Sequence, residues 1–320
     1  MPSIGIVTAY PEADWHSRQL IEAASGRVET VVVDPGDLSV DINDYGISIR
    51  TGGNGLNGLD GLILMRAINE DGNPDHQIEV YRALGRLGLQ MINDIQSAVT
   101  AQDKFRSSFA FRQAGLPTPR VTTAQNFRDA VRALREMGRA VIKPIYGSLG
   151  EGVIRVSADD EGTAVLEEYL HRDGVVYLQK YIDKPGRDIR AFVIGGRVVA
   201  AVYRVIGEGE WVTNIHCGAQ AVPCDLSPEI EELSLRAAGA IGLDYTGVDI
   251  IETDQGPVVI EVNGSPHWQG VYRATGKDIA GLIVDHLLQK IKFYEETGHK
   301  GGHKVKKLIE EGKRALDEGR

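Results

Sequence analysis

Three side chains in the last third of the chain have the types and spacing of a metal site. Asp249 lies in one β-rich run, Glu261 and Asn263 lie in the next, and the segment 253–257 between them is typical of a turn. A hairpin centred on Gln255 puts position 249 opposite position 261, and alternation along the strand puts Glu261 and Asn263 on that same face. The spacing predicts an oxygen-rich cluster that suits a hard cation such as Mg²⁺, with a solvated hairpin face as the alternative.

A lysine and a set of glycines indicate a phosphate site. Lys143 ends a β-rich run, and glycines follow at 147, 150 and 152. Glycines let backbone N–H groups approach phosphate oxygens, and the lysine adds a point charge. Because the Gly-Lys-Ser/Thr of a Walker A loop is missing, we expect a flap between two strands that closes over a triphosphate. An ordinary Gly-rich hairpin is the alternative.

The run Gln179-Lys180-Tyr181-Ile182 ends a later strand. A strand that leaves the core there exposes backbone N–H and C=O groups, and these can read an adenine edge, with Gln179 adding a polar side chain. An ordinary strand-to-turn junction is the alternative.

Several polar residues follow at once. Asp188 and Arg190 alternate onto one face, where one accepts from ribose hydroxyls and the other meets phosphate, with a surface ion pair as the alternative. Arg204 ends the next strand and suits a developing phosphoryl or tetrahedral charge. Asn214 adds a ligand or substrate contact, and His216 receives no role.

Strands and helices must position these residues. The first hundred residues alternate strand and helix, which predicts a small α/β unit with a mostly parallel sheet. We expect strands at 4–8, 28–33, 58–65, 89–93, 140–143, 153–156, 175–182, 189–194 and 197–205, and helices at 15–24, 75–87, 101–114, 127–137, 163–170, 228–241 and 278–291. The Lys/Glu-rich tail from about 292 is expected to be a solvated extension, where His299 and His303 bind no metal.

Length, charge and cysteine usage limit the class of protein. The 320 residues exceed what one core usually serves. A formal charge of −10 argues against broad nucleic-acid binding. Cys217 and Cys224 do not form a disulfide framework, and we expect both thiols to be reduced. The chain shows neither a signal peptide nor a membrane-spanning run, so a cytoplasmic protein is expected.

Taken in order, the motifs resemble those of ATP-grasp ligases. The resemblance runs from about Asp103 to Gln289, and within that superfamily the chain is similar to the RimK-like glutamate ligases. The matching pieces are Lys104, Val141-Ile-Lys143-Pro, Gly147-Ser-Leu-Gly-Glu-Gly152, Gln179-Lys-Tyr-Ile182, Asp188-Ile-Arg190, Val199-Ala-Ala-Val-Tyr-Arg204, Asn214-Ile-His216, Gly247-Val-Asp249 and Glu261-Val-Asn263-Gly-Ser-Pro266.

The resemblance implies an α/β (α+β) ATP-grasp fold. A small N-terminal α/β domain with a parallel sheet is expected at 1–97, and two α+β subdomains that clasp ATP are expected at 98–187, with the flap, and at 188–291, with the metal site. A charged tail is expected at 292–320.

The resemblance also implies roles for the residues. Asp249, Glu261 and Asn263 are expected to hold Mg²⁺, as two ions, with Mn²⁺ as a substitute; Arg204, Lys143 and Arg190 are the expected catalytic residues. ATP is expected to meet Lys104, Lys143, Gly147, Ser148, Leu149, Gly150, Gln179, Lys180, Tyr181, Ile182, Asp188 and Asn214.

The implied reaction is the ligation of a carboxylate to an amine. ATP phosphorylates the acceptor carboxylate, the amine of L-glutamate attacks the acyl phosphate, and phosphate leaves. The protein's work is positioning and charge stabilisation, so no side chain need be a covalent nucleophile. A closed flap keeps water off the acyl phosphate.

Departures from the RimK-like pattern fall on the acceptor side. Val212 stands where the ribosomal-protein-modifying members have an arginine, Cys217 follows His216, and His267 replaces a glycine. Trp211 and Trp268 look more like the archaeal ligases that attach L-glutamate to tetrahydromethanopterin or to a deazaflavin coenzyme. The resemblance therefore implies the tail of a tetrahydromethanopterin-type coenzyme as the acceptor.

Other readings stay open. A ribosomal protein C-terminus or an amino-group carrier protein are alternative acceptors, and a non-catalytic ATP-binding regulatory protein is the alternative of another class. A nicotinamide dehydrogenase needs Gly-x-Gly-x-x-Gly after the first strand, where this chain has Ala-Tyr-Pro-Glu-Ala. We expect small-molecule partners, no nucleic acid, no membrane and a homo-oligomer, either dimer or tetramer.

Overall fold

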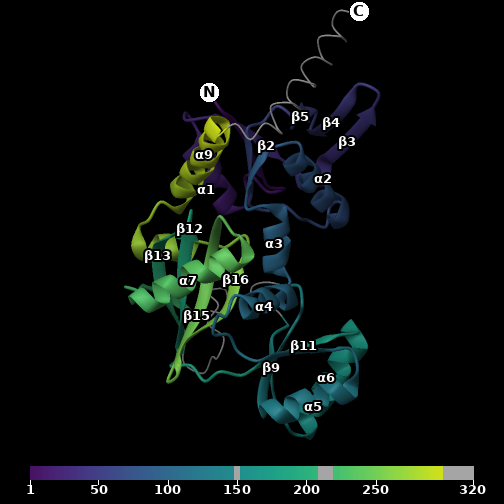
Figure 1. The fold of residues 1–320 in the computed structure, drawn as a ribbon, viewed down its shortest axis with the longest axis vertical. Coiled ribbons are helices and arrows are strands. Elements are labelled where there is room, and N and C mark those ends of the chain that lie inside the picture. Colours follow the sequence, from purple (N-terminus) through teal and green to yellow (C-terminus); the bar gives the residue numbers. More distant parts are fainter. Residues whose placement is uncertain (148–151, 208–218, 298–320) are drawn as a thin grey trace, which may run out of the picture. The chain divides into compact units, whose positions relative to one another are not determined.

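The computed structural model describes residues 1–147, 152–207 and 219–297, which fold into two compact units (Figure 1). Unit 1 contains Met1–Gln96, His267–Gln269 and the described residues from Asp278 onward. Unit 2 contains Ser97–Pro266 and Gly270–Lys277. The domain bounds expected above, at 97, 187 and 291, stay predictions.

Unit 1 is built on a four-stranded parallel sheet in the order β2-β1-β6-β7. Its strands are apolar and its helix α1 packs against α9, as expected for a parallel sheet covered by helices. Asp14 caps α1 by accepting from the Ser17 N–H. The elements are β1 (Ser3–Val7), α1 (Trp15–Ala24), β2 (Glu29–Val33), β6 (Gly61–Leu64), α2 (Pro74–Arg86), β7 (Gln90–Ile92) and α9 (Ile279–Thr297).

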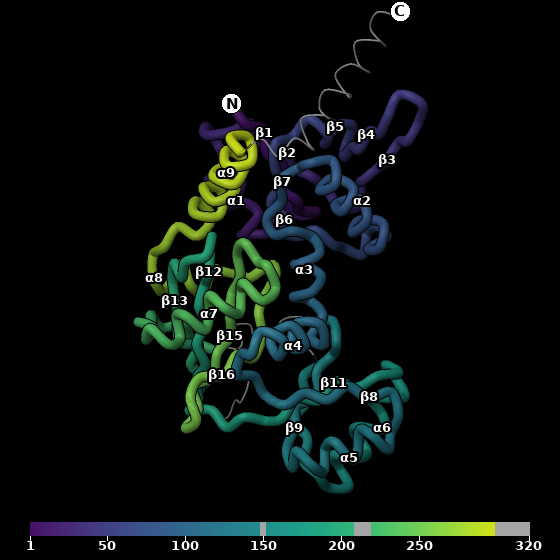
Figure 2. Tube along the Cα trace, viewed as in Figure 1, coloured from purple at the N-terminus to yellow at the C-terminus, as the bar shows by residue number. Residues whose placement is uncertain are grey.

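A hairpin in unit 1 is missing from the sequence-based expectation. Strands β3 (Leu38–Asn43) and β4 (Gly46–Thr51) pair in antiparallel register, and the short β5 (Asn54–Gly55) pairs with β4 (Figure 2). The turn at 43–46 is held by the Tyr45 N–H, which donates to the Asn43 side chain. The Gly/Asn-rich segment 51–61 therefore contains a short strand.

Unit 2 begins with two helices where one was expected. The predicted helix at 101–114 corresponds to α4 (Lys104–Gln113), and α3 (Ile95–Gln102) before it was missed except for its last two residues. Asp103 between them has extended backbone angles, and its carboxylate accepts from the N–H groups of Phe105 and Arg106. A capping aspartate starts a new helix because it satisfies N–H groups that have no partner in a first turn.

The first sheet of unit 2 has the order β10-β9-β11-β8 and is antiparallel. Helices α5 and α6 cover one face, where Leu134 and Leu166 pack with Ile142 and Leu178 in one buried core. The elements are β8 (Val121–Ala124), α5 (Phe127–Met137), β9 (Arg139–Lys143), β10 (Ile154–Ser157), α6 (Asp160–Asp173) and β11 (Val176–Lys180).

The second sheet of unit 2 has the antiparallel order β14-β13-β12-β15-β16. Side chains alternate between faces, so Ile189, Val248 and Val262 join the core under α7, while the residues between them point to the opposite face. The elements are β12 (Arg187–Ile194), β13 (Arg197–Val205), β14 (Gln220–Pro223), α7 (Pro228–Ile241), β15 (Tyr245–Thr253), β16 (Gly256–Asn263) and α8 (Gln269–Thr275).

The β15–β16 hairpin contains a register shift. Near the turn Thr253 pairs with Gly256 and Ile250 pairs with Val259, but Asp249 pairs with Glu261. Ile260 is the extra residue of a β-bulge. The expected pairing of 249 with 261 is thus confirmed, although the turn itself is centred half a residue before Gln255.

The end of the described chain is more ordered in secondary structure than expected. Helix α9 continues to Thr297, so the expected solvated extension begins as helix, and its side chains at 292–297 are exposed or half-buried. His299 and His303 lie outside the described residues. In the part of the chain that the structure describes, the helices are too short or too polar to cross a membrane.

Candidate functional site

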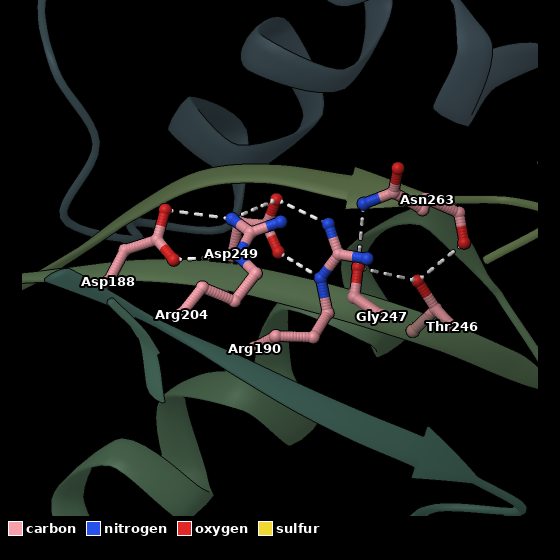
Figure 3. Close-up of polar contacts among 7 residues, drawn as sticks. All are labelled: Asp188, Arg190, Arg204, Thr246, Gly247, Asp249 and Asn263. Carbon is pink, nitrogen blue, oxygen red and sulfur yellow. Dashed lines mark hydrogen bonds and ion pairs between the residues drawn. The ribbon is translucent and has the colours of Figure 1, made fainter. Parts of the chain in front are cut away.

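A row of buried charges crosses three strands of the second sheet of unit 2 (Figure 3). Arg204 on β13 donates from Nε and Nη2 to the two carboxylate oxygens of Asp188 on β12, both at 2.7 Å. Nη2 of the same arginine lies 2.9 Å from Oδ2 of Asp249 on β15. Arg190 on β12 donates from Nε and Nη2 to both oxygens of Asp249. Asp249 thus lies between two guanidinium groups.

Strand register explains this row. Asp188 is opposite Arg204, and Arg190 is opposite Asp249, so each pair shares one face of the sheet. Gly247 leaves room for the Arg190 side chain, because a Cβ at 247 would lie 2.8 Å from Arg190 Cδ. The alternative of a surface ion pair at Asp188 and Arg190 is wrong, since Asp188 is 6% exposed and Asp249 is 2% exposed.

The charges stabilise one another strongly. Burial raises the pKa of Asp249, but the guanidinium groups of Arg190 and Arg204 outweigh burial and bring this pKa to about 2. Burial likewise lowers the pKa of Arg204, and the carboxylates of Asp249 and Asp188 raise it well above its ordinary value. Asp249 is therefore a fixed anion, and the arginines are fixed cations.

The expected metal ligands lie at the edge of this row. Glu261 is directly opposite Asp249 and interacts with its carboxylate. The Asn263 side chain donates from Nδ2 to the Gly247 carbonyl at 3.1 Å, which leaves its Oδ1 as an acceptor. Thr246 donates to the Asn263 carbonyl at 2.9 Å and fixes the strand end.

This donor set fits a hard cation. Two carboxylates and an amide oxygen are the ligands that Mg²⁺ prefers. Within the described residues, no group of three or more His, Cys, Asp or Glu side chains could hold a metal. The candidate site therefore depends on the amide of Asn263 as its third ligand.

Of the two lysines expected at the phosphates, Lys104 is held by the segment that follows Lys143. Lys104 begins α4, its N–H donates to the Ile145 carbonyl at 3.1 Å, and its Nζ donates to the Gly147 carbonyl at 2.9 Å. Burial lowers the pKa of Lys104, Glu261 raises it, and Lys143 lowers it further. Lys143 and Glu261 thus both act electrostatically on Lys104.

The expected adenine hinge needs a correction. The Lys180 N–H donates to the Arg120 carbonyl at 2.8 Å, and the Tyr181 N–H donates to the Arg139 carbonyl at 3.0 Å. These two N–H groups are not exposed, because β11 has neighbours on both sides. Gln179 is 4% exposed, and its Nε2 has no hydrogen-bond partner in the described structure. A buried amide without an acceptor favours the side chain of Gln179 as the group that meets a ligand.

One charged residue was not assigned a role from the sequence. The pKa of Lys184 is lowered by burial, while Asp188 and Asp249 raise it and Arg204 and Lys143 lower it. Lys184 therefore lies within electrostatic reach of the charged row. The motif Lys184-Pro-Gly186 marks a turn after the hinge, and this was the available signal.

Some expected site residues lie outside the described residues. These are Ser148, Leu149 and Gly150 of the flap, Asn214 and its neighbour His216, and the acceptor-side residues Trp211, Val212 and Cys217. Their expected roles stay predictions.

Comparison with known proteins agrees with the fold and the motifs. Residues 101–287 match the family model of the RimK-like ATP-grasp domain. The tetrahydromethanopterin:alpha-L-glutamate ligase of Methanosarcina acetivorans is 32% identical, over 90% of this chain and 99% of that protein. The probable alpha-L-glutamate ligase 1 of Shewanella amazonensis is 33% identical, over 93% of this chain and 96% of that protein.

Solved structures support the same fold. The ATP-grasp ligase PsnB bound to a minimal precursor superposes with a TM-score of 0.72 at 24% identity, covering 90% of this chain and 99% of that one. The RimK domain ATP-grasp protein of Sphaerobacter thermophilus superposes with a TM-score of 0.69 at 21% identity, covering 89% and 99%. The expected ATP-grasp fold is confirmed, and the chain belongs to the RimK-like family of ATP-grasp ligases.

Proposed function

We propose that this ligase joins L-glutamate to an acceptor carboxylate with conversion of ATP to ADP and phosphate. The observation that carries the proposal is the arrangement of Asp249 between Arg190 and Arg204, directly opposite Glu261. A carboxylate resists attack by an amine because oxide is a poor leaving group, and transfer of a phosphoryl group removes that obstacle. Such transfer needs positioned cations more than it needs a protein nucleophile.

Each part of the site has a proposed task. Lys104 and Lys143 hold the triphosphate, and the Gln179 side chain reads the base. Arg190 is the arginine that meets phosphate, since its side chain is 12% exposed while that of Arg204 is 5% exposed. Arg204 stays bound to Asp188 and contributes fixed positive charge to the transferring phosphoryl group.

Asp249, Glu261 and Asn263 are the proposed ligands of Mg²⁺. Mg²⁺ held by these residues would supply positive charge against the triphosphate. Two ions and replacement by Mn²⁺ belong to this proposal, as does the role of Asp188 in holding the ribose. The flap residues 147–150 and Asn214 complete the proposed ATP site.

The proposed acceptor is the carboxylate tail of a tetrahydromethanopterin-type coenzyme. Support comes from the relatives of Methanosarcina acetivorans and Methanococcus maripaludis, both named tetrahydromethanopterin:alpha-L-glutamate ligase. A deazaflavin coenzyme is the related alternative. A homo-oligomer and a cytoplasmic location are part of the same proposal.

A peptide or protein acceptor is the second candidate. The macrocyclase MdnC and the ligase PsnB, which share the fold, were solved with precursor peptides bound. A ribosomal protein C-terminus and an amino-group carrier protein belong to this class.

The test is mass spectrometry of products from the purified protein with ATP, Mg²⁺ and L-glutamate. Acceptors are a tetrahydromethanopterin-type pterin, a deazaflavin coenzyme, a ribosomal-protein C-terminal peptide and an amino-group carrier protein. The expected result is one added glutamate on the pterin with stoichiometric ADP. An adduct only on a peptide or protein would replace the coenzyme proposal with the second candidate, and ATP binding without any adduct would favour a non-catalytic role.

A further inference from the structure

A group of polar side chains in unit 1 has no role in the site described so far. The parallel sheet has the strand order β2-β1-β6-β7. The chain places β2 on one side of β1 and then β6 on the other side, so the strand order changes direction between β1 and β6. In open parallel sheets, ligands bind at the carboxyl ends of the strands at such a reversal. The Arg66 N–H donates to the Val7 carbonyl at 2.9 Å, and Ser17 Oγ of α1 lies 2.9 Å from Thr8 Oγ1, so the residues after both strands meet there.

An arginine lies at the centre of this group. Arg66 Nη2 lies 2.9 Å from Asp14 Oδ1 and 2.8 Å from His267 Nε2. An arginine only donates, so His267 Nε2 must accept and this imidazole is neutral with its proton on Nδ1. Both contacts leave from Nη2, and within the described structure Nε and Nη1 make no hydrogen bond. Arg66 therefore retains donors for a ligand.

Asp14 holds the group together, and both of its carboxylate oxygens have polar partners. Its Oδ2 accepts from the Ser17 N–H at 2.8 Å and from Ser17 Oγ at 2.7 Å, and its Oδ1 faces His16 Nδ1 at 3.4 Å as well as Arg66. Burial raises the pKa of Asp14, but hydrogen bonds from His16, Ser17 and Arg66 outweigh burial and lower it far below its ordinary value. Asp14 thus stays ionised and fixes Arg66 and His16 in place.

His16 has an unmet hydrogen-bonding atom. It is 5% exposed, and its Nε2 is buried with no hydrogen-bond partner in the described structure. The His267 ring lies over it at 4.5 Å between ring centroids, and Trp268, 1% exposed, packs edge-on at 4.7 Å. The His267 ring therefore covers His16 and also occupies a donor of Arg66. The low-dielectric surroundings strengthen any charged contact made there.

We propose that Arg66 and His16 form a carboxylate-binding subsite for the incoming amino acid, with the His267 ring as the acceptor that the carboxylate displaces. A charged carboxylate oxygen is a better partner for a guanidinium than a neutral imidazole nitrogen. Movement of His267 uncovers His16 Nε2 as well, which gives the ligand a second contact. An ion pair that only stabilised the fold would explain Asp14 with Arg66 but not the unpartnered His16 nitrogen.

The proposal rests on the proposed function, since both carboxylates of L-glutamate survive ligation and need recognition. Two substitutions should act in opposite directions. Arg66→Met should weaken L-glutamate binding about 10- to 100-fold, as expected for loss of a charge-assisted hydrogen bond. His267→Ala should tighten binding about 2- to 10-fold, because the competing acceptor is gone.

The experiment is a ligand-observed NMR titration of the full-length protein with L-glutamate in the absence of ATP, repeated as KM for L-glutamate and for ATP. Arg82→Met is the matched control, since Arg82 of unit 1 pairs with the exposed Glu79. Arg66→Lys preserves the charge beside Asp14 and replaces Arg66→Met as the test variant if Arg66→Met does not fold. Arg66→Lys should still weaken L-glutamate binding about 10-fold. KM for ATP should stay within twofold in every variant.

The outcomes separate this inference from the proposed function. Equal L-glutamate affinity in the Arg66 and Arg82 variants, or weaker binding in His267→Ala, overturns the subsite. Displacement of L-glutamate by inorganic phosphate at equal concentration shows a general anion site and overturns carboxylate selectivity. Failure of the wild type to form any adduct overturns the proposed function, while the ATP-free titration still decides on the subsite.

Discussion

Asp249→Asn tests both the stability and the catalytic role of the charged row. The substitution keeps the size of the side chain and removes its negative charge. Arg204 retains its two hydrogen bonds to Asp188, whereas Arg190 loses the carboxylate that accepts from both its nitrogens. The change therefore isolates the value of one buried charge rather than the collapse of the whole row.

The magnitude follows from the pKa of Asp249, which is lowered from 3.8 to about 2. Such a shift means that the ionised form stabilises the fold by about 2 kcal/mol more than the neutral form. Asparagine resembles the neutral form, so we expect the free energy of unfolding at pH 7 to fall by about 2 kcal/mol. This is less than the roughly 3–5 kcal/mol for breaking a fully isolated buried pair, because Asp188 still neutralises Arg204.

The pH dependence gives the prediction its sign. A carboxyl whose pKa is lower in the folded state contributes stability above its unfolded pKa and loses that contribution as pH falls towards the folded value. The difference between wild type and Asp249→Asn should therefore be full above pH 5. It should shrink as pH falls from about 4 and close near pH 2.

Urea denaturation at pH 7, 5, 4 and 3 measures this difference, and ADP release measures turnover. Asp285→Asn is the control, because Asp285 is an exposed partner of Arg27 and surface pairs contribute little. Unchanged stability at pH 7, or a gap at pH 3 as large as the gap at pH 7, would refute the electrostatic reasoning. Normal ADP release would refute the metal role of Asp249.

The remaining predictions concern individual roles in the ATP site. Glu261→Gln should abolish adduct formation while changing the free energy of unfolding by less than about 1 kcal/mol, since Glu261 is only partly buried; normal turnover would contradict its ligand role. Arg204→Lys should lower kcat about 100-fold with KM for ATP nearly unchanged, because lysine cannot reproduce the fork to Asp188 and Asp249; a defect confined to KM would contradict a contact with transition-state charge. Gln179→Leu should raise KM for ATP about 5- to 10-fold without lowering kcat, because the buried amide loses its proposed base contact; equal KM values would remove Gln179 from the base site.

The sequence predicts most elements because their signals are local. Trp15–Ala24, Phe127–Met137 and Pro228–Ile241 are helices with the expected bounds, each with a polar cap directly before it. The failure at Asp103 is also local. Its side chain satisfies the first turn of α4, and the apolar pattern that continues across it hid the interruption.

The sequence predicts which residues belong to the candidate site better than it predicts which of them contact one another. Cross-strand pairing could be counted from the turn, so Asp249 was expected opposite Glu261. The pairing of Arg204 with Asp188 depends on the alignment of β12 and β13. The Lys180 N–H donates to the carbonyl of Arg120, which lies far away along the chain. Sequence spacing carries no information about such long-range partners.

The group around Arg66 shows the same limit more strongly. Asp14, Arg66 and His267 come from segments separated by many residues, and only the path of the chain brings them into one unit. No motif spacing links them.

The bulge at Ile260 separates the β15–β16 hairpin into a part next to the turn, whose length can change in evolution, and a part that contains Asp249 and Glu261, whose spacing cannot. An extra residue at this position absorbs the mismatch between the turn-proximal ladder and the pairing of Asp249 with Glu261. Insertions and deletions made in matched pairs between 250 and 259 therefore alter only the length of the arm beyond the bulge. The spacing from Glu261 to Asn263 has no such tolerance, because a single added residue would turn one of the two side chains into the core. Related chains can consequently differ in hairpin length while they keep the same Glu-x-Asn signature.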